Sequence, residues 1–195
     1  MSDSSESSKF AELEQQARAL LEQGDVGAAA EVVVRALGPE LLGYLHAVAP
    51  SPDEADEVFS GYCERLLGGL ANFRGDSTIR TWSYRVIRNL LIGGWRARQR
   101  DRVRSPLTGE LSRVAAQVRS RTASYLQTEA KDRLTAIREQ LPEEDRTLLV
   151  LRVDRQLPWK EIAAIMLDDP DRAAVARLRK RFERLVVRLR DQMKA

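Results

Sequence analysis

The sequence predicts an all-α protein in which two small helical domains are joined by a flexible linker. Apolar residues recur at helical spacing almost throughout the 195 residues, and no alternating strand pattern of useful length occurs. Turn residues cluster at Ser105–Pro106 and Thr108–Gly109, where the apolar periodicity weakens. We therefore expect a first domain over residues 10–101, a linker over 102–128 and a second domain over 129–195.

The beginning of the first domain is marked by composition and by helix breakers. Residues 1–9 are serine-rich and acidic, which predicts a disordered tail. A helix is expected over residues 10–22 and is closed by Gly24. The next apolar pattern runs from residue 26 to 48, and we expect Gly38–Pro39 to interrupt it.

The clearest helix start is Ser51-Pro52-Asp53-Glu54. Serine suits the cap, proline suits the first turn and Glu54 completes a capping box, and the apolar face that follows extends to Leu70. Four acids lie near this helix start: Asp53, Glu54, Asp56 and Glu57. They either stabilise the helix dipole as a solvated cluster or form a docking surface, and their charge alone does not decide between the two.

A turn with Gly75 as breaker, and with Asp76 or Ser77 as cap, should precede a helix over residues 78–98. We expect Tyr84 and Trp95 to be its freer aromatic side chains. Its inward face is expected to consist of Ile79, Trp82, Val86, Ile87, Leu90 and Leu91, while the residues pointing elsewhere are Arg80, Tyr84, Arg85 and Arg88.

The second domain ends in the order of a helix-turn-helix. Helices are expected over residues 129–140 and 143–153, followed by a short helix over 159–167, a turn at Asp168-Asp169-Pro170 and a long basic helix over 171–193. In a helix-turn-helix the second of the two helices enters the major groove. The inward face of the basic helix should consist of Ala174, Leu178, Leu185 and Leu189.

Positive charge is concentrated in two segments, Arg74–Arg104 and Arg172–Arg190. Each carries a net charge of +7, whereas the whole chain carries only +3. Basic segments of this kind, with aromatic residues interleaved in the first, are typical of a nucleic-acid surface. Arginine is also far commoner than lysine, which suits phosphate and guanine contacts but equally follows from a GC-rich coding sequence.

Several functional classes are disfavoured by composition. The single cysteine, Cys63, allows no internal disulfide, and with the single histidine, His46, it provides no zinc cluster. The simpler interpretation of Cys63 is a small buried hydrophobic residue. We expect no catalytic activity, cofactor or metal. Because no signal peptide and no run of 18 apolar residues occurs, we expect a cytoplasmic protein without membrane insertion.

Two blocks of the chain, residues 28–104 and 134–189, resemble the sigma factors of bacterial RNA polymerase. The resemblance is to the compact extracytoplasmic-function type, which retains regions two and four. SPDEADEVFSGYCERLLGGLANFRGDSTIRTWSYRVIRNLLIGGWRARQR is similar to region two, with its acidic capped helix, Phe-Arg-Gly turn and arginine run. LPEEDRTLLVLRVDRQLPWKEIAAIM is similar to the start of region four. The order of the two blocks and the distance between them also agree.

The resemblance implies a promoter-specificity subunit whose partners are core RNA polymerase, promoter DNA and, as a further candidate, an anti-sigma factor. Contacts with polymerase would involve the β′ clamp helices and the β flap. The residues implied in clamp binding are Asp53, Glu54, Asp56, Glu57 and Arg65.

The resemblance also implies two DNA contacts. Residues 73–78 would shape a pocket for an unstacked base of the minus-ten element, and the following helix would neutralise the strands. The residues implied there are Phe73, Arg74, Asp76, Ser77, Thr78, Arg80, Trp82, Tyr84, Arg85, Arg88, Asn89, Arg96 and Arg98. At the upstream element they are Trp159, Lys160, Arg172, Arg177, Arg179, Lys180, Arg181 and Arg184.

The chain departs from the family pattern in three places. Ser60–Gly61 stands where a Gln-Glu pair is usual, residues 167–171 replace a glycine-containing turn, and the linker is basic where family linkers are commonly acidic. Two other functions compete with the sigma-factor interpretation. A stand-alone helix-turn-helix regulator would bind DNA without polymerase. A nucleic-acid enzyme would require paired interior carboxylates or a histidine base, which the pattern does not provide.

Overall fold

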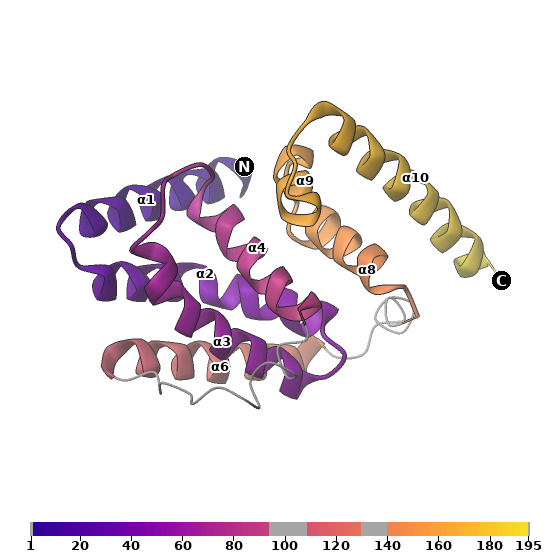
Figure 1. Cartoon of the computed structure of the whole chain (residues 1–195). Helices are drawn as coiled ribbons and strands as arrows, with labels where there is room; N and C mark the ends of the chain where they lie inside the picture. Colours follow the sequence, from indigo (N-terminus) through magenta and orange to yellow (C-terminus); the bar gives the residue numbers. More distant parts are fainter. Residues whose placement is uncertain (1, 94–108, 130–139, 195) are drawn as a thin grey trace. The chain divides into compact units, whose positions relative to one another are not determined.

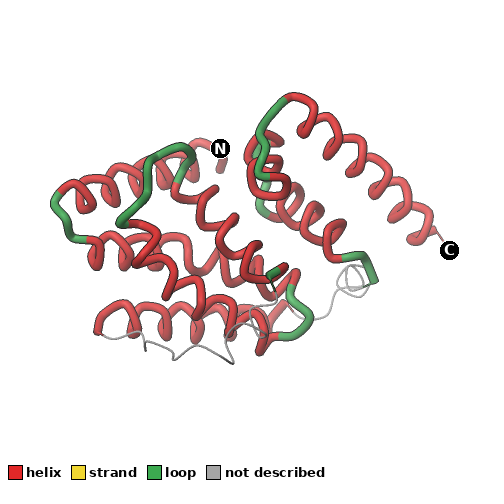
Figure 2. Tube along the Cα trace, in the orientation of Figure 1, coloured by secondary structure: helices red, strands yellow, loops and turns green. Residues whose placement is uncertain are grey.

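The computed structural model describes residues 2–93, 109–129 and 140–194, and the chain divides into two compact units, Met1–Tyr125 and Leu126–Ala195. Figure 2 shows that the described residues are helices joined by turns, with no strand among them. The predicted all-α class is therefore confirmed. Within these described ranges, none of the helices has the length and apolar character needed to cross a membrane.

Unit 1 begins with α1 (Ser2–Glu22) and α2 (Val26–Val48), which pack against each other (Figure 1). Asp25 caps α2 by accepting a hydrogen bond of 2.9 Å from the Ala28 amide. Residues 2–9, which the composition predicts to be disordered, instead continue α1 toward the N-terminus. The physical reason is that extending a formed helix costs less than nucleating one.

The predicted interruption at Gly38–Pro39 is wrong, because α2 continues through both residues. The Pro39 nitrogen carries no hydrogen to donate to the Arg35 carbonyl, but both residues are exposed, so water can bind that carbonyl instead. Gly38 is buried for a different reason: a Cβ there would come within 3.1 Å of both methyl carbons of Val118 and 3.5 Å of the Phe59 ring. Its role is close packing.

The start predicted for α3 (Pro52–Leu70) is confirmed, since the Ser51 hydroxyl accepts a hydrogen bond of 3.2 Å from the Glu54 amide. The helix after it, α4, spans Ile79–Ile92, and its cap is Thr78 and not Asp76 or Ser77. Thr78 provides the side-chain acceptor for the Thr81 amide, at 3.1 Å. The last residues of the predicted helix lie outside the described part of the chain.

The core of unit 1 is formed by α2, α3 and α4. Its largest fully buried side chains include Tyr44, Tyr62 and Tyr84, and the Tyr44 and Tyr84 rings meet edge to face with centroids 5.2 Å apart. The Tyr62 hydroxyl donates to Ser83 Oγ at 2.9 Å. Cys63 is fully buried, and burial raises the pKa of its thiol to about 12, so its simpler interpretation is confirmed.

Part of the expected linker forms a regular helix, α6 (Gly109–Glu129), which lies against α2 and α3. It buries Leu111, Val114, Ala115 and Val118. The Arg119 guanidinium also donates a hydrogen bond of 2.6 Å to Ser60 Oγ on α3. These apolar residues are separated by polar ones in a weak periodicity, and the packing partners that stabilise α6 lie more than 50 positions away in sequence.

Unit 2 contains α8 (Glu143–Leu149), the π-helical turn η1 (Val150–Asp154), α9 (Trp159–Leu167) and α10 (Arg172–Lys194). The predicted short helix matches α9 residue for residue. Most of the predicted helix over 129–140 lies outside the described residues. Asp168 adopts the left-handed conformation, with φ of 56°, and so occupies the turn position where glycine is common.

The inward face predicted for α10 is confirmed. Ala174, Leu178 and Leu185 are buried, and Leu189 packs against the cluster of Leu141, Leu149 and Leu185. Asp171 caps α10 by accepting a hydrogen bond from the Ala174 amide. The helix-turn-helix order expected from the sequence is therefore present in the backbone of this unit.

Candidate nucleic-acid and protein interfaces

The acidic turn, defined as Asp53, Glu54, Asp56 and Glu57, lies in the first turns of α3 outside the buried face of that helix. Asp53 is exposed and the Asp56 side chain is 49% exposed. Asp56 Oδ1 lies 3.7 Å from His46 Nε2, and partial burial lowers the pKa of His46 although Asp56 opposes that shift. The fifth residue of the predicted polymerase-binding set, Arg65, is exposed farther along α3.

Ser60, one of the two departures from the family pattern on α3, is committed to internal contacts. Its hydroxyl donates to the Asp56 carbonyl at 2.8 Å and accepts from Arg119 at 2.6 Å. A residue of α6 thus borders the acidic turn. This neighbour could not be found from the sequence, because the contact joins positions 59 residues apart.

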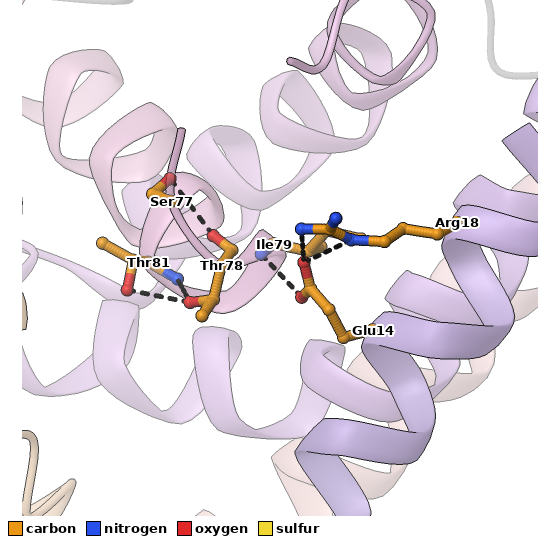
Figure 3. Close-up of polar contacts among 6 residues, drawn as sticks. All are labelled: Glu14, Arg18, Ser77, Thr78, Ile79 and Thr81. Carbon is orange, nitrogen blue, oxygen red and sulfur yellow. Dashed lines mark hydrogen bonds and ion pairs between the residues drawn. The ribbon is translucent and has the colours of Figure 1, made fainter. Parts of the chain in front are cut away.

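The capture loop, defined as residues 71–78, connects α3 to α4 and contains much of the predicted minus-ten pocket. Figure 3 shows how its end is held: Thr78 accepts from the Thr81 amide, and the Ile79 amide donates to Glu14 Oε2 of α1 at 2.9 Å. Arg18 in turn donates to Glu14 Oε1 from Nη2, at 3.1 Å. Sequence reasoning did not identify Glu14 or Arg18 as part of this site.

The aromatic residues of the capture loop region pack on each other. The Phe73 and Trp82 rings meet edge to face with centroids 5.9 Å apart. A Cβ on Gly69 of α3 would lie 2.5 and 2.7 Å from two carbons of the Trp82 indole, so glycine is needed for this ring to fit. Both aromatic side chains are half-buried, and each keeps some surface available to a ligand.

Two residues of the predicted minus-ten set are held inside the fold by Glu40 of α2. Arg80 pairs with Glu40 Oε1 at 2.6 Å, and its guanidinium carbon lies 4.1 Å from the centre of the Phe10 ring. The Tyr84 hydroxyl donates to the same oxygen at 2.7 Å. Tyr84 is fully buried, so the expectation of a freer aromatic side chain is wrong. The expectation failed because the Tyr84 hydroxyl is bonded to the Glu40 carboxylate inside the fold, and helical spacing does not reveal such a partner.

The remaining predicted residues differ in exposure. The exposed ones are Arg74, Asp76, Thr78 and Asn89. Half-buried positions are Phe73, Ser77, Trp82, Arg85 and Arg88. Arg96 and Arg98, with Trp95, lie outside the described residues. The described part of the predicted minus-ten set is therefore the capture loop together with α4, and the arginine run that follows lies outside the described residues.

In unit 2 the predicted upstream set lies mainly on the exposed side of α10. Arg172, Arg177, Arg179, Lys180 and Arg184 are exposed. Arg181 differs, because its Nε donates to Asp145 Oδ1 of α8 at 2.7 Å and its Nη1 lies 3.8 Å from Glu144. This ion pair gives Arg181 a role within the fold, which the count of basic residues on α10 does not reveal.

Asp145 is a buried carboxylate that joins α8 to α10. Its side chain is 6% exposed and accepts hydrogen bonds from both Arg181 and Arg188. Burial alone would raise the pKa of Asp145, but the two guanidinium groups outweigh it and lower that pKa. The same residues line an open hollow of about 800 Å³ together with Glu183, Arg184 and Val187.

Trp159, at the start of α9, is packed within unit 2. Its ring meets Phe182 edge to face with centroids 5.5 Å apart, and the guanidinium carbons of Arg152 and Arg179 lie 5.0 and 5.8 Å from its centre. Its neighbour Lys160 is exposed. This arrangement orients α9 against α10 and leaves Lys160 as the more accessible of the two predicted backbone contacts.

Comparisons with known proteins point to one family. The family described as Sigma-70 region 2 matches residues 33–101. RNA polymerase sigma-H factor of Pseudomonas aeruginosa is 30% identical over 132 residues, which cover 65% of this chain and 66% of the relative. RNA polymerase sigma factor YlaC of Bacillus subtilis is 31% identical over 137 residues, which cover 65% of this chain and 73% of the relative.

Proposed function

Because this chain belongs to the RNA polymerase sigma factors, of the extracytoplasmic-function type, we propose that it directs transcription initiation through three surfaces. The acidic turn binds core polymerase, the capture loop with α4 binds the minus-ten element, and the exposed side of α10 binds the upstream element. The observation that carries the proposal is that the acidic turn at the start of α3 and the capture loop between α3 and α4 both lie within the matched residues 33–101. The protein itself performs no catalysis in this scheme.

The acidic turn is suited to a basic or helical partner. Its carboxylates lie at the first turns of α3, where the helix dipole holds them, while the apolar face of the helix stays in the core. Binding therefore requires no unfolding of unit 1. We assign this surface to the β′ clamp helices of polymerase, with Arg65 at its far end.

The capture loop supplies the chemistry for holding an unstacked base. Phe73 and Trp82 provide aromatic surface, and stacking on such rings contributes about 1–3 kcal/mol per base. That gain offsets the few kcal/mol that unstacking costs. Arg74 is exposed within the loop, and Arg85 and Arg88 follow on α4, where they can neutralise the separated strands.

The exposed side of α10 is the surface assigned to the upstream element. Its N-terminal end carries Arg172 beyond the turn at Asp168, and residues near the start of a recognition helix reach base edges most readily. The β flap would be contacted by other parts of unit 2. The buried Asp145 pairs keep α10 in place for both tasks.

In vitro transcription tests the proposal directly. Purified core polymerase with this chain should initiate from a subset of a promoter library, and the variant with Asp56→Lys and Glu57→Lys should bind core polymerase more weakly while keeping its helical content. Glu22→Ala on α1, another exposed acid, is the matched control and should behave as wild type. If the double variant bound core polymerase with unchanged affinity, the acidic turn would serve only to stabilise the dipole of α3.

The second candidate is a stand-alone helix-turn-helix regulator, which the backbone of unit 2 would also permit. It predicts specific binding to duplex upstream DNA by the chain alone, with no change when core polymerase is added. Footprinting with and without core polymerase separates the two functions.

A further inference from the structure

We propose that Glu14 and Arg18 of α1 are positioning residues for minus-ten recognition: they fix the capture loop in the shape that binds an unstacked base. The inference rests on the proposed role of the capture loop, and it goes beyond that role because α1 precedes the matched residues 33–101. Neither residue needs to touch DNA in this arrangement.

The first contact is between Glu14 and the start of α4. The first amides of a helix lack intrahelical acceptors. Thr78 satisfies the Thr81 amide, and Glu14 Oε2 accepts from the Ile79 amide at 2.9 Å. A carboxylate at this point also favours the positive end of the helix dipole. Ile79, which directly follows the capture loop, is thus tied to a residue of α1 that lies 65 positions earlier in the chain.

The second contact extends the same link to the middle of the loop. Arg18 donates to Glu14 Oε1 from both Nε, at 3.3 Å, and Nη2, at 3.1 Å. Its Nη2 also lies over Gly75, where an added Cβ would be only 3.3 Å away. Gly75 has φ of 79°, a left-handed conformation that glycine adopts without strain. Arg18 therefore lies against the loop at Gly75, the loop residue with a positive φ.

A third contact shows that the link is not confined to one hydrogen bond. At the second residue of α4, the Arg80 guanidinium carbon lies 4.1 Å from the centre of the Phe10 ring of α1. Phe10, Glu14 and Arg18 are spaced four residues apart and so share one side of α1. That side meets the loop and the beginning of α4 together (Figure 3 shows the Glu14 and Arg18 contacts).

Arg18 is half exposed, and an exposed pair of this kind contributes little to global stability. Its effect on the loop is different, because fixing the loop before DNA arrives removes an ordering cost from base capture. Loss of Glu14 or Arg18 should therefore weaken minus-ten binding more than it weakens the fold.

The test uses the full chain with core polymerase and three variants: Glu14→Ala, Arg18→Ala and the control Glu22→Ala. Permanganate reactivity of melted thymines measures opening, and binding to a single-stranded minus-ten oligonucleotide measures base capture. Glu14→Ala removes a contact that resembles a helix cap, so we expect permanganate reactivity and oligonucleotide affinity each to fall by about fivefold. Core affinity should stay at the wild-type value, and Arg18→Lys should recover part of the Arg18→Ala loss.

Amide hydrogen exchange gives a readout that is independent of DNA. Exchange at Ile79 should accelerate in Glu14→Ala, while amides in the middle of α2 keep their protection. Unchanged exchange at Ile79, or unchanged oligonucleotide binding, would overturn the proposal. So would an equal loss of core affinity or of α2 protection, which would show a general structural role. If instead the wild-type holoenzyme does not open promoters, the proposed function fails, and the exchange experiment still decides whether Glu14 fixes the loop.

Discussion

Removal of the Asp145 carboxylate should destabilise unit 2 and leave unit 1 unchanged. In Asp145→Ala, Arg181 and Arg188 lose a common acceptor, and α8 loses two hydrogen bonds to α10, while the longer contact of Glu144 with Arg181 remains. Hydrogen bonds to charged groups contribute about 1.5–3 kcal/mol each. Because the two arginine side chains are 37% and 57% exposed, water replaces part of what they lose. We therefore expect a total loss near the value of one such bond, about 2–3 kcal/mol.

Hydrogen exchange across a urea series measures this loss in the full chain, because peptides from each unit are followed separately. Peptides of α8 and α10 should lose protection at lower urea in Asp145→Ala, with peptides of α2 and α3 as the internal control. Arg181→Ala should reproduce part of the effect. The double variant Asp145→Ala/Arg181→Ala should be less destabilised than the sum of the single variants, because the two residues act through one interaction.

The effect should also depend on pH in a defined direction. Arg181 and Arg188 lower the pKa of Asp145 against the opposing effect of burial, so the folded state favours the charged carboxylate. Its contribution is therefore fully present above the unfolded pKa of about 4 and is lost as pH falls through the lower folded value. The difference between wild type and Asp145→Ala should stay constant from pH 5 to 8 and shrink below about pH 4.

A specific result would contradict this account of Arg181. If Arg181→Ala leaves the exchange of unit 2 unchanged and weakens DNA binding as much as Arg184→Ala does, then Arg181 acts on DNA and its ion pair with Asp145 is incidental.

Two further changes test the packing of the capture loop and the orientation of α10. Gly69→Ala should displace the Trp82 ring, since the new Cβ would lie 2.5 Å from it. Tryptophan fluorescence and binding to a minus-ten oligonucleotide should both report the displacement. An unaltered spectrum and an unaltered affinity would show that the ring has room to move. Arg172→Ala should reduce discrimination at one upstream promoter position by about 1–3 kcal/mol, whereas Arg184→Ala should weaken binding to all sequences equally. Binding to promoters altered at single positions measures both effects. If the two results were exchanged, α10 would enter the groove in the reverse orientation.

Local signals in the sequence predicted much of the fold. The capping serine at Ser51, the bounds of α9 and the inward face of α10 depend on neighbouring residues or on helical periodicity, and all three are confirmed. The interruption at Pro39 was wrong because packing along α2 overrides a local breaker. Tertiary contacts keep α2 continuous there, and the periodicity of the sequence carries no information about them.

The sequence predicted which residues belong to the candidate site, but it could not predict which residues they contact in the fold. Tyr84 and Arg80 are polar residues on a basic helix, and nothing near them in sequence indicates that Glu40 holds both. Glu14 and Arg18 form an ordinary i, i+4 pair until the structure brings the Ile79 amide to them. Contacts across 40 or more positions depend on the fold, so a count of charged residues cannot separate surface arginines from structural ones.

This separation leads to a prediction about the salt dependence of upstream DNA binding. Six basic residues of α10 were assigned to the upstream element, but Arg181 forms an ion pair with Asp145 inside unit 2. The five that remain exposed are Arg172, Arg177, Arg179, Lys180 and Arg184. Each phosphate contact contributes about 0.9 to the slope of log affinity against log salt, so α10 should contribute a slope of no more than about 4.5. Titrations of the holoenzyme and of Arg181→Ala on duplex upstream DNA between 50 and 200 mM salt measure it. The slope should be the same for both proteins, and a decrease of about one unit in Arg181→Ala would place that guanidinium on a phosphate after all.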